Sequence, residues 1–124
     1  MIIRDPLAIL LVSDDPARLR TALTLARTEL ALGGSVQMFL QGEAAPLLRS
    51  PITSPRDADW LAAGEPSLAT LLDEALEDGV TISLCQSGVA MANMEAGELD
   101  PRLTFSGPVA FLATVTQGVR LLSI

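Results

Sequence analysis

The 124-residue sequence predicts an α/β fold, a three-layer α/β/α sandwich built on a five-stranded, mainly parallel sheet. Three observations predict this class. Short apolar runs recur along the chain, and stretches with the leucine spacing of a helix lie between them. The first run, Leu7 to Val12, is apolar without interruption, which is typical of a strand covered by helices on both faces. Strands that alternate with helices are joined by right-handed crossovers and therefore lie parallel.

The first half of the chain has clear signals for where its elements begin and end. Asp15 and Pro16 are favoured at the N-cap and the first position of a helix, and Gly33-Gly34 is favoured at its end. The second strand is expected at residues 36–40. We expect the charged residues of the first helix on its solvent side, namely Arg18, Arg20, Arg27 and Glu29.

The middle of the chain is expected to be less regular. Residues 43–48 are predicted to form a short helix. Residues 49–64 contain Pro51 and Pro55, several Ser and Thr residues, and no periodic pattern. Because this stretch is long for a connection in a compact domain, it is interpreted as a loop insertion or a lid within a single domain that spans residues 1–124.

The second half repeats the alternation. A helix is expected to begin at Glu65-Pro66 and to end at Gly79. The remaining elements are expected at residues 80–84 (strand), 89–96 (helix, ended by Gly97), 103–105 (strand), 108–116 (helix) and 119–123 (strand).

The composition excludes several classes of chemistry. The chain has no histidine, tyrosine or lysine, and all 8 basic residues are arginines. A Ser-His-Asp or Cys-His pair therefore lacks its base, and lysine Schiff-base or P-loop chemistry lacks its lysine. One cysteine cannot form a structural zinc site. We expect neither a metal nor a cofactor.

Charge and hydropathy indicate which partners to expect. The net charge of −7 and the pI of about 4.3 disfavour direct binding to nucleic acid. Apolar residues make up 49% of the chain, and the mean hydropathy of +0.42 is high for a small soluble monomer. Part of the apolar surface is therefore expected to be buried between subunits.

We expect no secretory signal at the N-terminus. Asp5 and Pro6 stand where a secretory signal is apolar, and the run from Leu7 to Val12 is too short to span a membrane. A lone cysteine without a disulfide partner fits a reducing compartment, so a cytoplasmic location without a membrane association is expected.

Cys85 is the strongest candidate for a reactive group. It follows the predicted strand 80–84, and ligands gather at the carboxyl ends of parallel strands. The turn that it begins with Gln86, Ser87 and Gly88 leads into a helix, whose free N–H groups and dipole favour a thiolate. Gln86 and Ser87 are candidate hydrogen-bond donors to the sulfur, although Ser87 is expected mainly as the helix N-cap. The alternative for Cys85 is a small buried core residue.

Other candidates share this edge of the sheet or could approach it. Ser13, Asp14 and Gln41 follow the first two strands. Asp14 is expected mainly in the helix cap, although Ser13 and Asp14 could instead receive a phosphate. Met91 either lines a soft pocket near the sulfur or packs in the core. Trp60 is either an interface anchor or part of a lid over the core.

Several segments together resemble the DsrE/DsrF-like sulfur-relay family, which includes the TusD type of subunit. The resemblance rests on the first strand, polar loop and helix (residues 7–32), the Gly-Gly turn into residues 36–40, the run from Leu71 to Val80 before Ile82-Ser83-Leu84-Cys85, and the closing strand. It implies that Cys85 accepts sulfane sulfur from a donor protein, holds it as a persulfide and passes it to an acceptor protein. It also implies a homotrimer or homohexamer. Because the chain has no lysine or histidine, we expect nearby amides, and Arg102 or a partner's arginine, to stabilise the thiolate of Cys85.

Three hypotheses follow for the function. The first is a sulfur carrier, of the sulfurtransferase class, that acts through Cys85. The second is a non-catalytic oligomeric subunit or small-ligand binding module of the same fold with an inert Cys85. The third is a redox sensor that uses its single thiol through glutathionylation or intersubunit pairing.

Overall fold

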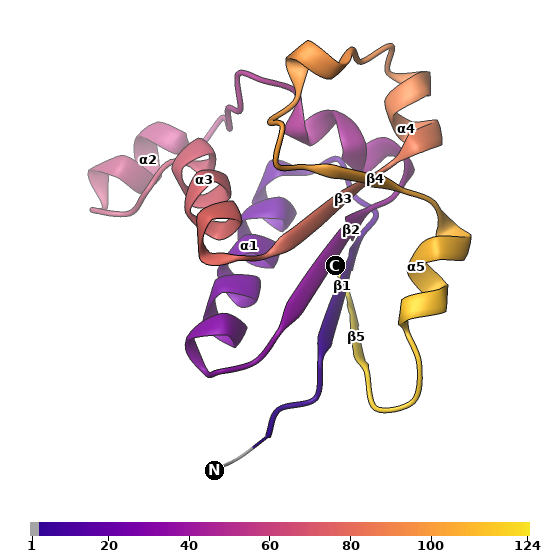
Figure 1. Ribbon diagram of the computed structural model, residues 1–124. Coiled ribbons are helices and arrows are strands. Elements are labelled where there is room, and N and C mark those ends of the chain that lie inside the picture. The colour runs from indigo at the N-terminus through magenta and orange to yellow at the C-terminus, as the bar shows by residue number, and fades with distance from the viewer. Residues whose placement is uncertain (1–2) are drawn as a thin grey trace.

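The computed structural model describes residues 3–124, and its central feature is a five-stranded sheet with the strand order β4-β3-β2-β1-β5 (Figure 1). Every neighbouring pair is parallel, which confirms the predicted α/β class. The strands are β1 (Leu7–Leu11), β2 (Val36–Leu40), β3 (Thr81–Cys85), β4 (Thr104–Ser106) and β5 (Arg120–Ser123). The helices are α1 (Pro16–Ala31), α2 (Asp57–Ala62), α3 (Leu68–Asp78), α4 (Gln86–Met91) and α5 (Pro108–Thr114), with 3₁₀ segments η1 (Gly42–Leu48) and η2 (Ala96–Glu98).

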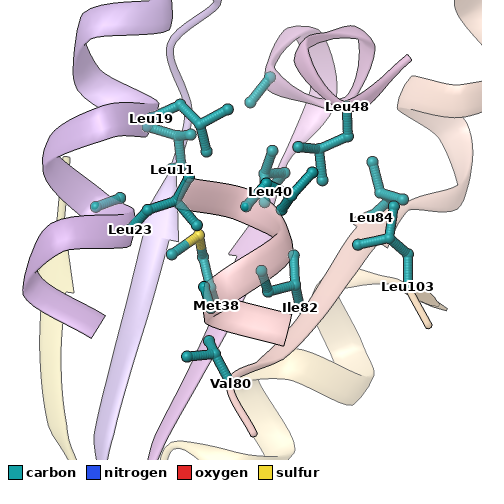
Figure 2. Packing of buried hydrophobic residues seen from close by; sticks show 14 of the residues in the cluster. Leu11, Leu19, Leu23, Met38, Leu40, Leu48, Val80, Ile82, Leu84 and Leu103 are labelled. Carbon is teal, nitrogen blue, oxygen red and sulfur yellow. The ribbon is translucent and has the colours of Figure 1, made fainter. Parts of the chain in front are cut away.

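The larger core lies between one face of the sheet and the helices α1 and α3 (Figures 1 and 2). Alternate strand residues point to this face, because successive side chains of a strand lie on opposite sides. Figure 2 shows Leu19 and Leu23 of α1 and Met38 of β2 in this core, all fully or almost fully buried. The helix α1 starts where predicted, since Asp15 is its N-cap and the Asp15 carboxylate accepts a hydrogen bond from the Ala17 N–H at 2.9 Å.

The opposite face of the sheet carries a smaller core under α5. Its buried residues are Ala8, Phe39, Cys85 and Phe111. The rings of Phe39 and Phe111 stack with their centroids 5.0 Å apart, which attaches α5 to β2. One helix of seven residues covers only part of this face, so the third layer is thin.

The sequence pattern predicts no regular structure over residues 49–64. The structure differs, because this segment contains α2. The Asp57 carboxylate accepts hydrogen bonds from the backbone N–H groups of Ser54 and Leu68, each at 3.0 Å. These bonds join the start of α2 to the start of α3, which begins at Leu68 after the N-cap Ser67 and not at Glu65. A local side-chain contact therefore orders a stretch that has no hydrophobic periodicity.

Glu29 is the clearest error in the predicted faces of the first helix. It is 5% exposed, whereas the sequence analysis placed it on the solvent side. Its carboxylate binds Arg4 Nε at 2.6 Å, Arg4 Nη2 at 3.0 Å and Arg120 Nη2 at 2.9 Å. Because Arg4 precedes β1 and Arg120 begins β5, this cluster ties both segments to the end of α1.

Among residues 3–124, no helix combines the length and the apolar character that are needed to cross a membrane.

Candidate functional site

Cys85 is the last residue of β3 and occupies the N-cap position of α4. The helix therefore begins at Gln86, without the turn that the sequence predicted at residues 85–88. Ser87 lies inside the first turn of α4 and is not its N-cap. This direct passage from strand to helix holds the thiol at the edge of the sheet where chemistry is expected.

The helix α4 is also shorter than predicted. It ends at Met91, whereas the pattern of small and apolar residues suggested a helix over residues 89–96. Asn93 has a φ of +52°, a left-handed conformation that stops the helix. Gly97, expected at the helix end, lies in the separate 3₁₀ turn η2.

The Cys85 sulfur is surrounded by hydrogen-bond donors. Its distance to the Ser87 hydroxyl oxygen is 3.0 Å. Burial by itself raises the pKa of the thiol, but hydrogen bonds from the Ser87 hydroxyl and from the backbone N–H groups of Gly42, Gly88 and Ser87 outweigh it. The net effect is a pKa of Cys85 below the ordinary value for cysteine, which favours the thiolate.

A close approach of two backbone segments brings the N–H of Gly42 to the sulfur. Gly42 begins η1 with a φ of +55°, and α4 packs directly against η1. A Cβ atom on Gly88 would lie 2.3 Å from the Gly42 carbonyl oxygen and 3.1 Å from the Cβ of Ala45. Only glycine at position 88 permits this contact, so both glycines are part of the site.

A cavity of about 570 Å³ adjoins the thiol. Ser87, Gly88 and Gly42 form part of its wall, and the sulfur lies behind them, since Cys85 is 0% exposed. Met91, which is 84% exposed, stands at the wall of the cavity and not in the core. The complete lining is Asp14, Gly42, Glu43, Pro46, Ser87, Gly88, Met91 and Ala92.

The structure brings together only some of the predicted site residues. Asp14 and Met91 line the cavity beside the thiol, together with Ser87 and Gly88. The Ser13 hydroxyl instead accepts a hydrogen bond from the Asp15 N–H at 3.0 Å, as part of the turn into α1.

Four other candidates make no recorded contact with the sulfur. The side chain of Gln86 is exposed, and Gln41 lies outside the cavity lining. Trp60 lies on α2 beside α1, where the Arg20 guanidinium lies over its ring. Arg102 binds Asp73 and Asp100, so it does not stabilise the thiolate as the sequence analysis had considered.

Sequence reasoning missed two contributors from η1. The N–H of Gly42 donates to the sulfur, and the carboxylate of Glu43 lines the cavity. The signal for Gly42 was present, because it comes two residues after β2 ends at Leu40, at the same edge of the sheet as Cys85. Nothing in the sequence indicated that η1 would pack on α4.

Within the described part of the chain, no group of three or more His, Cys, Asp or Glu side chains is arranged to hold a metal ion. The site therefore consists of one sulfur, one hydroxyl and backbone N–H groups, with carboxylates at the cavity wall.

The fold and the site define an α/β domain with one hydrogen-bonded cysteine at the carboxyl edge of a parallel sheet. The chain belongs to the DsrE/DsrF-like family, whose model matches residues 7–124. No curated protein matches it.

Three solved structures share the fold. Protein BT1422 of Bacteroides thetaiotaomicron has a TM-score of 0.71 at 20% identity, covering 97% of this chain and 95% of its own. The ychN protein of E. coli has a TM-score of 0.70 at 14% identity, and the match covers 98% of this chain and 100% of the ychN chain. Protein MTH1491 of Methanobacterium thermoautotrophicum has a TM-score of 0.68 at 17% identity, and the match covers 97% of this chain and 99% of the MTH1491 chain. BT1422 and MTH1491 are described as proteins of unknown function, so these likenesses show the fold alone.

Proposed function

We propose that this chain is a sulfur-relay protein of the TusD type that accepts sulfane sulfur on Cys85 as a persulfide and passes it to a partner. The observation that carries the proposal is the set of donors around the sulfur, which lowers the pKa of Cys85 despite its burial. A thiolate is the nucleophile that sulfur transfer needs. Membership of the DsrE/DsrF-like family, which is associated with sulfur relay in general, supports the same conclusion.

The proposed chemistry needs one thiol and no external oxidant. The Cys85 thiolate attacks the outer sulfur of a donor persulfide, so that an S–S bond forms at Cys85 while the donor's S–S bond breaks and the donor leaves as a thiolate. An acceptor thiolate then attacks the same outer sulfur, and Cys85 leaves as a thiolate. The donors from Ser87 and Gly42 stabilise Cys85 as nucleophile in the first step and as leaving group in the second.

Access to the sulfur sets a condition on this mechanism. Because Cys85 is fully buried, a donor reaches it only when the wall made by Gly42 and Ser87 opens toward the cavity. The backbone contact between Gly88 and Gly42 is the place where α4 and η1 must separate.

The same burial favours a second candidate function. Cys85 packs with Ala8, Phe39 and Phe111 in the smaller core, as an inert core cysteine would. In that case the chain is a non-catalytic oligomeric subunit or a small-ligand module. A redox-sensing role is disfavoured by the same packing, because oxidation also requires an accessible thiolate.

The first prediction separates these two functions. Incubation with a cysteine desulfurase and cysteine is expected to add one sulfur, about 32 Da, to the native protein, and Cys85→Ser is expected to remain unmodified. Intact-protein mass spectrometry measures the gain. Ser87→Ala retains the thiol but removes a donor, so it should label more slowly with iodoacetamide at neutral pH. A thiol that is alkylated only after unfolding, with no sulfur gained, would establish the inert module.

We also propose that the chain forms a homotrimer or homohexamer and exchanges sulfur with donor and acceptor proteins in the cytoplasm. The exposed apolar side chains around the thin third layer support self-association. They include Val12, Val109, Leu112 and Leu121. The cytoplasmic location rests on the single unpaired thiol.

The second prediction concerns this assembly. Native mass spectrometry is expected to give a multiple of three of the 13.0 kDa chain. Leu112→Asp places a charge on the outer face of α5 and is expected to shift the population toward monomer, since an unpaired charge is disfavoured in an interface. Leu61→Asp is the matched control, because Leu61 is also an exposed leucine but lies on α2, distant in sequence from α5. A wild-type monomer at micromolar concentration would contradict the proposal.

A further inference from the structure

The arginines of this chain are almost all paired with carboxylates. The sequence holds 8 arginines as its only basic side chains, against 15 acidic residues. Six of the arginines form ion pairs: Arg4, Arg27, Arg49, Arg56, Arg102 and Arg120. Within residues 3–124, Arg18 and Arg20 form none, and Arg18 is exposed on α1. Arg20 is therefore distinctive, because it is half-buried and still lacks a carboxylate.

The guanidinium of Arg20 is held in place by Trp60. Its Cζ atom lies 3.9 Å from the centroid of the Trp60 ring, a cation–π contact between α1 and α2. The Nη1 atom is buried and has no hydrogen-bond partner in the described part of the chain. A buried donor without an acceptor is unfavourable, and a positioned guanidinium is suited to bind a carboxylate with two N–H groups.

A cavity of about 600 Å³ lies beside this guanidinium, between α1 and the segment that contains α2. Its size is typical of sites for small organic molecules. Arg20 and the hydroxyl-bearing residues Thr21 and Thr24 contribute polar groups from α1. The apolar part of the lining consists of Pro16, Ala17, Leu25, Pro55, Trp60 and Leu68.

We propose that this cavity binds a small organic monocarboxylate with an apolar body. The carboxylate pairs with Arg20, and the apolar body packs against Trp60, Leu25 and Leu68. Arg56 also lines the cavity, but its guanidinium is paired with Asp59. A single negative charge therefore fits best, because Asp15 and Glu65 also line the cavity and repel a polyanion. The cavity shares no lining residue with the one beside Cys85, so the proposal does not depend on sulfur transfer.

The binding test uses the protein's own fluorescence. Trp60 is the only tryptophan, so its emission reports on this cavity alone. The probe is sodium octanoate, below the concentration at which it forms micelles. Octanoate is expected to change the emission saturably, whereas octan-1-ol should bind at least about tenfold more weakly and octylammonium and inorganic phosphate should give no saturable change.

Variants assign the effect to Arg20. Arg20→Gln is expected to weaken octanoate binding at least about tenfold, and Arg20→Lys, which keeps the charge but loses the fork of donors, several-fold. Arg18→Gln removes the other unpaired arginine of α1 and should bind as the wild type does. Cys85→Ser should also bind normally, which separates this site from the proposed relay. Circular dichroism confirms that each variant is folded.

Three results would overturn the proposal. They are the absence of a saturable change with octanoate, equal binding of octanol and octanoate, and an equal loss of binding in Arg18→Gln and Arg20→Gln.

Discussion

Gly88→Ala is expected to destabilise the protein by about 1–3 kcal/mol, the range for a side chain forced into a closely packed site. The new Cβ would lie 2.3 Å from the Gly42 carbonyl oxygen, so α4 and η1 must move apart. That movement withdraws the N–H group of Gly42 from the sulfur and is expected to raise the pKa of Cys85. Urea unfolding measures the first effect, and the alkylation rate of Cys85 against pH measures the second.

Gly97→Ala is the matched control for this substitution. Gly97 has an ordinary φ, and no atom outside its neighbours lies within 4 Å of the position of its added Cβ. The same chemical change should therefore leave stability within about 0.5 kcal/mol of the wild type and the alkylation profile unchanged. If Gly88→Ala behaves like Gly97→Ala, the contact between η1 and α4 does not control the thiol.

Glu29→Gln has the other large expected effect, a destabilisation of about 2–3 kcal/mol at neutral pH after allowance for solvent around the partly exposed arginines. The carboxylate joins Arg4 before β1 and Arg120 of β5 to the end of α1. Hydrogen bonds from Arg4 lower the pKa of Glu29 to about 2, and Arg120 acts in the same direction while burial opposes both. Glutamine keeps the shape of the side chain but not its charge. Urea unfolding of both proteins at pH 7 measures the difference.

The pH dependence of this effect has a definite sign. The pKa of Glu29 is depressed in the folded state, from 4.5 to about 2. The carboxylate therefore stabilises the fold fully above pH 4.5, and this contribution is lost as the pH falls toward 2. The difference in unfolding free energy between wild type and Glu29→Gln should shrink over that window.

Glu77→Gln removes an exposed carboxylate of α3 that forms no ion pair within residues 3–124, and it serves as the control for a change in net charge. It should alter stability by less than about 0.5 kcal/mol. A Glu29→Gln protein whose deficit stays constant from pH 7 to pH 2 would refute the role of the charge.

The sheet was predictable from the sequence because local patterns determine it. An uninterrupted apolar run predicted β1, and a mostly apolar run predicted β2, whose observed boundaries, Val36 and Leu40, are those expected. Asp15 and Pro16 marked the start of α1 through contacts within a few residues. The same reasoning placed Cys85 at the end of β3, since strand ends follow from the length of each run.

The errors share a physical cause, which is contact with residues distant in sequence. Glu29 looks like a solvent-facing helix residue, and only its proximity to Arg4 and Arg120 makes burial of its carboxylate favourable. The early start of α4 and the packing of its Gly88 on Gly42 depend on where η1 lies. No hydrophobic periodicity in the sequence indicates either contact.

The sequence by itself determined the α/β class, the parallel strands, the absence of histidine and lysine, and the place of the single thiol. These depend on composition and on interactions within about one turn or one strand. The tertiary structure alone decided that Cys85 is buried, that Gly42 and Ser87 donate to its sulfur, and that Arg20 faces a cavity beside Trp60. Burial, hydrogen bonds across elements and cavities arise only when distant segments pack, because each needs atoms from more than one of them.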